Sequence, residues 1–405
     1  MTISGDALKS LAQEAALMPQ EEMLEVGRQN KKLYIGIPKE TSFKENRVAL
    51  APEAVSLLAA HGHTVVIETN AGKPASFSDN DYSEAGARIA YEKEEVFKAD
   101  LIFKVAPPTN EEIDLMQRKQ TLFSALQLTV QPKNTLKKLM EKKATAIAWD
   151  YVKDNSGIFP VIRSMGELSG NTAILKAGQY LSAEDGRGML LGGVAGIAPA
   201  EVVIIGAGTV AEYAARAALG LGAIVKVFDN STYKLRRLQN TLGQRIYTSV
   251  ITPKVLAKAL RRADVAIGAL RAPAGRTPLV VSDQMVQEMK EGAVIIDVSI
   301  DQGGCFETSR VTSHENPTYR VYGIVHYCVP NIASGVPRTA SFALSNIFAP
   351  LILDIGEGGG MEKIIHDNAG FRHGVYMYKG ALTSSYLGET YGLPYKDLNL
   401  LMAAF

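Results

Sequence analysis

Short apolar runs alternate with amphipathic stretches along most of the chain. Residues 52–61 and 133–142 carry apolar side chains at the three- and four-residue spacing of a helix. Between such stretches, strands of the first half are predicted at 33–38, 64–69, 101–105, 121–126 and 145–149. Strands that are apolar along their whole length and separated by helices indicate a mostly parallel sheet covered on both faces.

The second half repeats this alternation. Its predicted strands are 201–206, 224–229, 264–270, 293–299 and 321–327, and its predicted helices are 208–220, 232–242, 253–262 and 283–290. Residues 338–355 and 360–383 have a helical pattern and extend no strand series, so we expect them to pack back on the first block. Residues 5–30 predict one or two amphipathic helices before the first strand.

Composition narrows the class of protein. With 405 residues, 46% hydrophobic and 21% charged, the chain has the make-up of a soluble globular protein of two or three domains. Its 43 basic residues balance 42 acidic ones, which argues against a nucleic-acid partner. The N-terminus resembles no targeting peptide, and the apolar region 188–211 is broken by glycines, a proline and Glu201, so we expect no membrane partner.

Cysteine and histidine usage points to a reducing compartment without a metal. The two cysteines, Cys305 and Cys328, are too few for a disulfide scaffold, so we expect a cytoplasmic protein in which both are inert packing residues. The six histidines show no close Cys/His spacing, and we expect no metal site.

The strongest motif is Gly206-Ala207-Gly208-Thr209-Val210-Ala211, between a predicted strand and a predicted helix. Glycines here permit a tight turn and a close approach to a pyrophosphate, which the helix N-terminus attracts. Asp229 ends the next strand, where an acid meets the ribose hydroxyls and repels a 2′-phosphate, so NAD is favoured over NADP. Lys234 lies close enough to soften that preference. The alternative is an ordinary strand-to-helix turn with a solvated Asp229.

Five segments resemble NAD-dependent alanine dehydrogenase. They are IGIPKETSFKENRVALAPEAV (35–55), LIFKV (101–105), VVIIGAGTVA (202–211), IDQGGCFETSRVTSHENPTY (300–319) and CVPNIASGVPRTASFALSN (328–346). The likeness extends from residue 33 to about 400, and its first two segments are shared with the NAD(H)-binding domain of proton-translocating transhydrogenase.

The resemblance implies an α/β fold in which two Rossmann-like domains with parallel sheets flank an interdomain cleft. The domains expected are an N-terminal arm (1–32), a substrate domain (33–160 plus 333–405) and an NAD-binding domain (161–332). The implied activity is the reversible oxidative deamination of L-alanine to pyruvate and ammonia. The implied assembly is a homo-oligomer, a hexamer built from dimers.

Three charged residues are candidates for the chemistry. Arg47 offers a guanidinium fork suited to a carboxylate, and the resemblance places the substrate clamp there; a surface arginine is the alternative. Lys104 ends an apolar strand, where desolvation is expected to lower its pKa toward neutrality. The resemblance makes Lys104 a substrate-binding and catalytic residue, although it could equally extend its ammonium group from the strand end into water.

Asp301 follows a strand in a glycine-rich loop, and the resemblance makes it an acid/base beside the nicotinamide. Asp297, within that strand, competes with it, but a carboxylate that accepts backbone N–H bonds is the favoured interpretation there. The remaining residues expected to contact NAD are Ala207, Thr209, Val210, Asn230, Leu270 and Asn331.

The chain departs from the resembling family at two positions. Gln127 stands where the family has a substrate-contacting histidine, and a glutamine can hydrogen-bond a substrate but cannot titrate near neutral pH. Gly166 replaces a serine usually offered to the cofactor. Either Lys104 and Asp301 carry the protons while Gln127 orients the substrate, or alanine turnover is lost. The second case leaves a non-catalytic or transhydrogenase-like NAD(H)-binding protein, or a dehydrogenase of another amino or imino acid.

Overall fold

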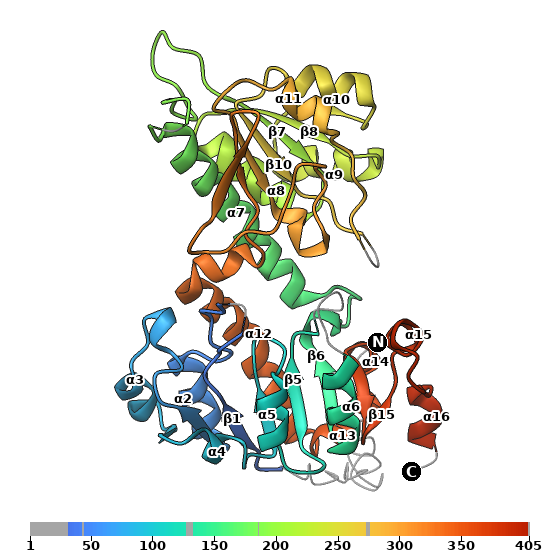
Figure 1. Cartoon of the computed structure of the whole chain (residues 1–405). Coiled ribbons are helices and arrows are strands. Elements are labelled where there is room, and N and C mark those ends of the chain that lie inside the picture. The colour runs from blue at the N-terminus through green and yellow to red at the C-terminus, as the bar shows by residue number, and fades with distance from the viewer. Residues whose placement is uncertain (1–30, 43, 127–132, 185, 273–275, 404–405) are drawn as a thin grey trace, which may run out of the picture.

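A computed structural model describes residues 31–403 except 43, 127–132, 185 and 273–275. The helices expected at 5–30 and residue Gln127 lie outside the described residues. The described chain forms two lobes, each built on one sheet (Figure 1). The domain boundaries expected from the sequence remain predictions.

The first lobe contains an eight-stranded sheet of order β15-β14-β6-β5-β4-β1-β2-β3. Its strands are β1 (Tyr34–Ile37), β2 (Thr64–Glu68), β3 (Arg88–Ala90), β4 (Leu101–Phe103), β5 (Thr121–Ser124), β6 (Thr145–Ala148), β14 (Val375–Tyr378) and β15 (Ala381–Leu382). The helices between them are α2 (Pro52–Ala60), α3 (Asp79–Glu84), α4 (Lys93–Val96), α5 (Asn110–Leu115) and α6 (Lys133–Glu141), with the 3-10 turns η1 (Lys73–Ala75) and η2 (Trp149–Tyr151). β1 to β6 pair in parallel, as the pattern of apolar runs predicts.

The second lobe contains a seven-stranded sheet of order β12-β13-β11-β10-β7-β8-β9. Its strands are β7 (Glu201–Ile205), β8 (Ile224–Phe228), β9 (Tyr247–Ser249), β10 (Val265–Gly268), β11 (Val294–Asp297), β12 (Thr318–Val321) and β13 (Ile324–Tyr327). Its helical segments are α8 (Thr209–Gly220), α9 (Thr232–Leu242), α10 (Pro253–Leu260), α11 (Asp283–Gln287) and the 3-10 turns η3 (Val298–Gln302) and η4 (Ile332–Gly335). Alternate residues of β7 pack into two different hydrophobic cores. Val202 and Ile204 belong to one core, and Val203 and Ile205 belong to the other, so both faces of this sheet are covered.

Two long helices carry the chain between the lobes (Figure 1). α7 (Pro160–Ser182) leaves the first lobe and packs along α8 in the second. Its Gly170 makes this packing possible, because a Cβ there would lie 2.4 Å from the Val210 carbonyl oxygen. α12 (Pro337–Glu357) returns and packs on α2. α12 has the length and hydropathy of a membrane span, but half of its most apolar window is buried, as in the core helix of a folded lobe.

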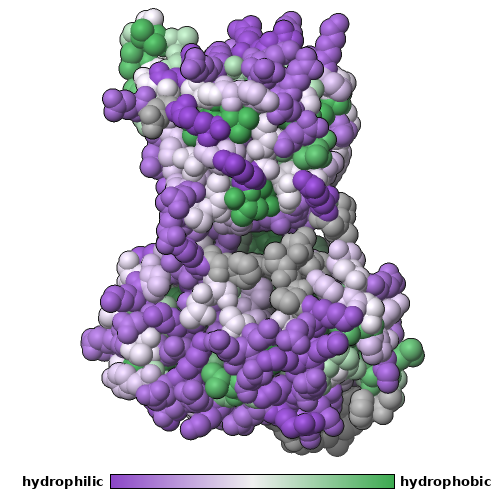
Figure 2. Space-filling view, in the orientation of Figure 1, coloured by the Kyte–Doolittle hydropathy of each residue, from purple (hydrophilic) through white to green (hydrophobic). Residues whose placement is uncertain are grey.

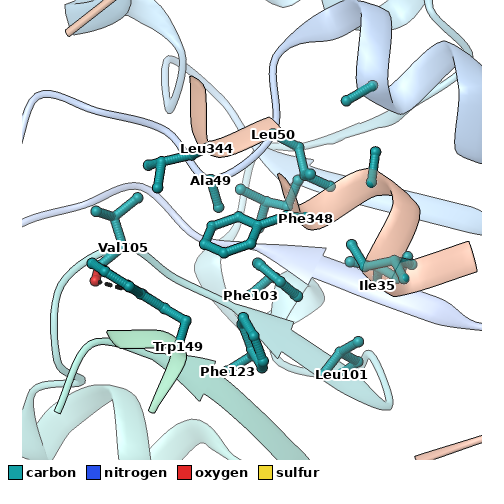
Figure 3. Close-up of a cluster of buried hydrophobic side chains, with 14 of the residues drawn as sticks. Ile35, Ala49, Leu50, Leu101, Phe103, Val105, Phe123, Trp149, Leu344 and Phe348 are labelled. Carbon is teal, nitrogen blue, oxygen red and sulfur yellow. Dashed lines mark hydrogen bonds between the residues drawn. The ribbon is translucent and has the colours of Figure 1, made fainter. Parts of the chain in front are cut away.

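Aromatic side chains from both ends of the chain meet in the core of the first lobe (Figure 3). Phe348 of α12 contacts Phe103 of β4 and Phe123 of β5 edge to face, with ring centroids 5.0 and 5.6 Å apart. The Trp149 indole N–H donates to the Val105 carbonyl at 3.2 Å, which satisfies its one polar group. This core holds the returning C-terminal helix against the strand ends.

The structure contains all ten strands that the apolar runs predict but corrects two segments. The run 321–327 is interrupted by a turn at Tyr322 and Gly323, both with positive φ (54° and 76°), so β12 and β13 form an antiparallel hairpin. The helix expected over 360–383 is wrong. After α13 (Met361–Asp367) and α14 (Ala369–Arg372), β14 pairs antiparallel with β6, because the sheet edge there supplies the backbone partners that outweigh helical spacing. The chain then forms α15 (Ser385–Tyr391) and α16 (Leu398–Ala403).

Candidate active site

The segment after β1 is held in place by three serines of the C-terminal part. The hydroxyl oxygens of Ser334, Ser341 and Ser345 accept the backbone N–H groups of residues 46, 48 and 51 at 3.0, 3.0 and 2.7 Å. This segment has no strand or helix partner to satisfy those N–H groups, so the hydroxyls replace a sheet neighbour. The backbone on either side of Arg47 is fixed as a result.

Arg47 is almost wholly buried, and Glu45 holds one edge of its guanidinium group. Nε and Nη2 of Arg47 donate to the two carboxylate oxygens of Glu45 at 2.7 and 2.6 Å. Burial alone would raise the pKa of Glu45, but the charge and hydrogen bonds of Arg47 outweigh it and lower that pKa. A guanidinium group has two forked edges, and on the second edge of Arg47 the Nη1 group donates to Met165 Sδ at 3.1 Å. A thioether is a weak acceptor, so this is the edge on which a second carboxylate could replace it.

Lys104 follows β4 and is fully buried between two carboxylates. Its Nζ lies 2.8 Å from Glu40 Oε2 and 3.2 Å from Glu112 Oε1. The expectation of a lowered pKa is wrong. Desolvation does lower the pKa of Lys104, but the two carboxylates outweigh it and raise that pKa above its ordinary value. Lys104 therefore stays an ammonium group at neutral pH, with one N–H left after the two ion pairs.

Asp301 and Asn331 bring the second lobe to the same place. The backbone N–H of Asn331 donates to Asp301 Oδ1 at 2.8 Å, and its side-chain amide donates to Glu45 Oε2 at 2.6 Å. Asp301 is exposed to solvent on one side, but the surrounding protein desolvates its carboxyl group and raises its pKa. The Asn331 N–H and the charge of Arg47 act in the opposite direction, and the desolvation outweighs them. The charge of Glu40, the partner of Lys104, also acts on Arg47.

The structure thus brings Arg47, Lys104, Asp301 and Asn331 together at the carboxyl ends of strands from both sheets. The surface of the molecule narrows between its two lobes (Figure 2). A cationic pair and a carboxyl group of raised pKa can bind an anionic small molecule and exchange a proton with it. Gln127, also predicted to contact the substrate, lies outside the described residues.

The glycine-rich turn fits a dinucleotide. Gly206 has φ +120°, and a Cβ there would lie 2.3 Å from the Ala269 carbonyl oxygen, so only glycine fits between these strands. Gly208, at the N-cap of α8, has open space where its Cβ would be and no side chain caps the helix. The first turn of α8, with Thr209, Val210 and the buried Ala211, therefore offers its N–H groups to an anion.

The other predicted cofactor residues lie around this turn in different ways. Asp229 binds it directly, since its Oδ2 accepts the Ala207 N–H at 2.8 Å. Leu270 is adjacent, with its backbone nitrogen 3.2 Å from the position of a Gly206 Cβ. Asn230 and Lys234 are exposed beyond Asp229. Gly166 of α7 faces the first turn of α8, where a Cβ would lie 3.4 Å from Thr209 Cβ.

Asp297 and the cysteines have structural environments. The Asp297 carboxylate is buried and accepts from the backbone N–H groups of Ser299 and Cys305 and from the Ser309 hydroxyl. Both cysteines are buried and unpaired, and burial raises the pKa of Cys328 to about 11, which disfavours a thiolate.

Sequence reasoning missed the acidic residues that pair with the site's cations. Glu40, Glu45 and Glu112 all belong to charged stretches that resemble solvated loops, whereas each has its carboxylate buried in the fold. A signal for Glu112 was available, because Thr109 and Glu112 have capping-box spacing and their side chains cap α5 reciprocally. No comparable signal marks the serines of α12.

Comparisons with known proteins agree on one family. The model "Alanine dehydrogenase/PNT, N-terminal domain" matches residues 36–169, and "Alanine dehydrogenase/PNT, C-terminal domain" matches residues 173–385. The chain is 39% identical to the alanine dehydrogenase of Methanococcus maripaludis over 366 residues, which cover 90% of this chain and 98% of the relative. It is 39% identical to the alanine dehydrogenase of Mycolicibacterium smegmatis over 373 residues, covering 92% of this chain and 100% of the relative.

Solved structures show the same likeness. An L-alanine dehydrogenase structure superposes with a TM-score of 0.83 at 36% identity, covering 88% of this chain and 99% of that one. A transhydrogenase from Sinorhizobium meliloti superposes with a TM-score of 0.74 at 22% identity, covering 87% and 99%, which shows a common fold alone.

Proposed function

The chain belongs to the alanine dehydrogenase/PNT family, and from this premise we propose that it is an NAD-dependent L-alanine dehydrogenase. It interconverts L-alanine and water with pyruvate and ammonia. One observation carries the assignment of the site: Arg47 and Asp301, from separate loops, are joined by hydrogen bonds through Glu45 and Asn331. Lys104, from a third loop, pairs with Glu40, whose charge acts on Arg47. A bound nicotinamide dinucleotide supplies the two-electron acceptor.

Arg47 binds the substrate carboxylate on its Nη1–Nη2 edge, because Glu45 occupies the other edge. Lys104 donates its remaining N–H to the carbonyl oxygen of pyruvate and stabilises negative charge that develops there. Asp301, whose pKa is raised, accepts and returns the proton exchanged with the amine and with water. In this scheme Gln127 orients the substrate without titrating.

NAD is the expected cofactor because a carboxylate stands where a 2′-phosphate would bind. Asp229 is buried at the end of β8 and is fixed by the Ala207 and Ser231 backbone N–H groups at 2.8 and 2.7 Å. Its negative charge is thus held beside the turn, whereas the basic side chain of Lys234 is exposed. NADP turnover should be much weaker than NAD turnover.

The assay is NADH formation, followed by its near-ultraviolet absorbance, on adding L-alanine and NAD to the purified protein at alkaline pH. Bulkier amino acids in the same assay test the alternative substrates. Arg47→Lys keeps the charge but removes the fork, and should lower kcat/KM for pyruvate about 100-fold. Protein that binds NADH tightly but oxidises no alanine would contradict the proposal.

The protein works in the cytoplasm as a homo-oligomer in this proposal. The segment between α7 and β7 projects from the second lobe (Figure 1), and its Leu190, Val194 and Ile197 are 63%, 60% and 64% exposed. Apolar side chains grouped on a projecting loop are typical of a contact between copies. Light scattering of Val194→Asp, compared with wild type, tests whether this segment holds the assembly together.

A further inference from the structure

Glu45 accepts hydrogen bonds from four donors although its side chain is only 1% exposed. Three come from Arg47, namely its backbone N–H at 3.0 Å, Nε at 2.7 Å and Nη2 at 2.6 Å. The fourth is the side-chain amide of Asn331, at 2.6 Å. Arg47 belongs to the loop after β1 and Asn331 to the loop after β13, so this one carboxylate joins the two lobes.

The backbone on both sides of this contact is held in an unfavourable conformation. Lys44, which precedes Glu45, has φ 49°, and Asn331 has φ 54° and ψ 49°. Residues other than glycine seldom adopt the left-handed region, and they keep it where the surrounding contacts over-determine it. The Asn331 conformation aims two donors at once, its N–H at Asp301 and its amide at Glu45.

We propose that Glu45 is a positioning residue that couples the substrate clamp to the acid/base group. Through its bonds to Arg47 it fixes which guanidinium edge faces the substrate, and through Asn331 it fixes where Asp301 lies. Binding of a 2-oxo carboxylate on Arg47 and correct placement of Asp301 are then one event. The inference rests on the proposed function, because it concerns the same reaction.

The test variant is Glu45→Gln. All four neighbours of the carboxylate are donors, so whichever way the amide turns, its NH2 group faces two of them and breaks those bonds. We expect kcat/KM for pyruvate to fall about 100-fold, with a higher KM and an unchanged affinity for NADH. Glu315→Gln is the matched control: this exposed carboxylate pairs with Lys44 beside the same loop but outside the chain of bonds, and its removal should leave kcat/KM unchanged.

A second variant isolates the link between the lobes. Asn331→Gly removes the side-chain amide but keeps the left-handed backbone and the N–H that binds Asp301, and we expect about a 10-fold fall in kcat/KM. If Glu45 acts through Asn331, the double variant falls no more than about threefold below Glu45→Gln alone. Independent effects would multiply to about 1,000-fold, and that result would overturn the coupling.

Binding separates this inference from the proposed function. Oxamate, an unreactive isostere of pyruvate, is titrated into protein saturated with NADH, and Glu45→Gln should weaken it about 10-fold or more. If the wild type oxidises no alanine, the proposed function fails, whereas the oxamate comparison still tests the clamp. Should Glu45→Gln fail to fold, Glu45→Asp keeps the charge at a shorter reach and should give an intermediate loss. Oxamate binding and kcat/KM within about threefold of wild type in the folded variant would refute the role of Glu45.

Discussion

Replacing Ser345 by alanine tests whether hydroxyls of α12 hold the loop that carries Arg47. Ser345 Oγ accepts the Ala51 N–H at 2.7 Å, and Ala51 is fully buried, so no water can take over that bond. A buried N–H left without a partner costs about 1–3 kcal/mol. We expect this cost to appear as local opening of residues 46–51, because the Ala51 N–H is one of the three backbone donors of that segment that serine hydroxyls hold.

Hydrogen exchange followed by mass spectrometry measures the local opening of residues 46–51 directly. A loss of about 1–3 kcal/mol speeds exchange of the amides in 46–51 by about 5- to 150-fold, and KM for pyruvate should rise as Arg47 loosens. Ser182→Ala is the control: its hydroxyl also bonds a helix carbonyl, that of Gly178 at 2.8 Å, but it accepts no described backbone N–H and is exposed. Equal exchange of 46–51 in both variants would show that the hydroxyl does not fix the segment.

Three further predictions follow from the two lobes. Gly206→Ala should unfold the second lobe, because the new Cβ would lie 2.3 Å from a carbonyl oxygen. Gly208→Ala meets no such atom, so this variant should have the melting temperature of the wild type but a lower affinity for NADH. A Gly208→Ala protein with wild-type affinity for NADH would contradict the assignment of the turn. Burial lowers the pKa of His326 from 6.5 to about 4, so between these pH values the unfolded chain binds the proton more readily than the folded chain. The free energy of unfolding should therefore fall by up to about 3 kcal/mol as the pH drops from 6.5 to 4. His326→Gln should flatten this dependence of stability on pH, whereas the same change at the exposed His373 should not. Burial would raise the pKa of Glu112, but its ion pairs outweigh burial and lower that pKa below 4.5. The stabilisation by Glu112 is therefore present above pH 4.5 and is lost as the pH falls through the lowered pKa. Glu112→Gln should lower the free energy of unfolding in urea at pH 7 by about 3–5 kcal/mol and weaken its dependence on pH in acid.

Much of the fold could be predicted because strand and helix periods are local properties. The ten apolar runs mark strands that are buried on both faces, and such strands are apolar along their whole length. The edge strands β3, β9 and β12, and β14 next to the edge of its sheet, were not predictable in this way. They are three or four residues long, and they exist because a neighbouring strand offers unpaired backbone groups, which is a tertiary fact.

Only part of the candidate site could likewise be predicted from the sequence. The glycine-rich turn and Asp229 could be read from spacing, because a dinucleotide demands those residue types at those intervals. The raised pKa of Lys104 could not, since a lysine at the end of an apolar strand looks desolvated until Glu40 and Glu112 are placed beside it. Carboxylates 64 residues before and eight residues after Lys104 carry no mark in the sequence of their common destination.

The shared helix α7 is a mechanical lever. Its 23 residues span about 34 Å, so a tilt of about 5° at one end carries the other through about 3 Å. Met165, near its beginning, touches the Arg47 guanidinium group, and from Gly166 onward α7 packs on α8, the helix that follows the glycine-rich turn. A small tilt of α7 beside Arg47 would therefore displace the lobe that contains the glycine-rich turn by several times the original shift.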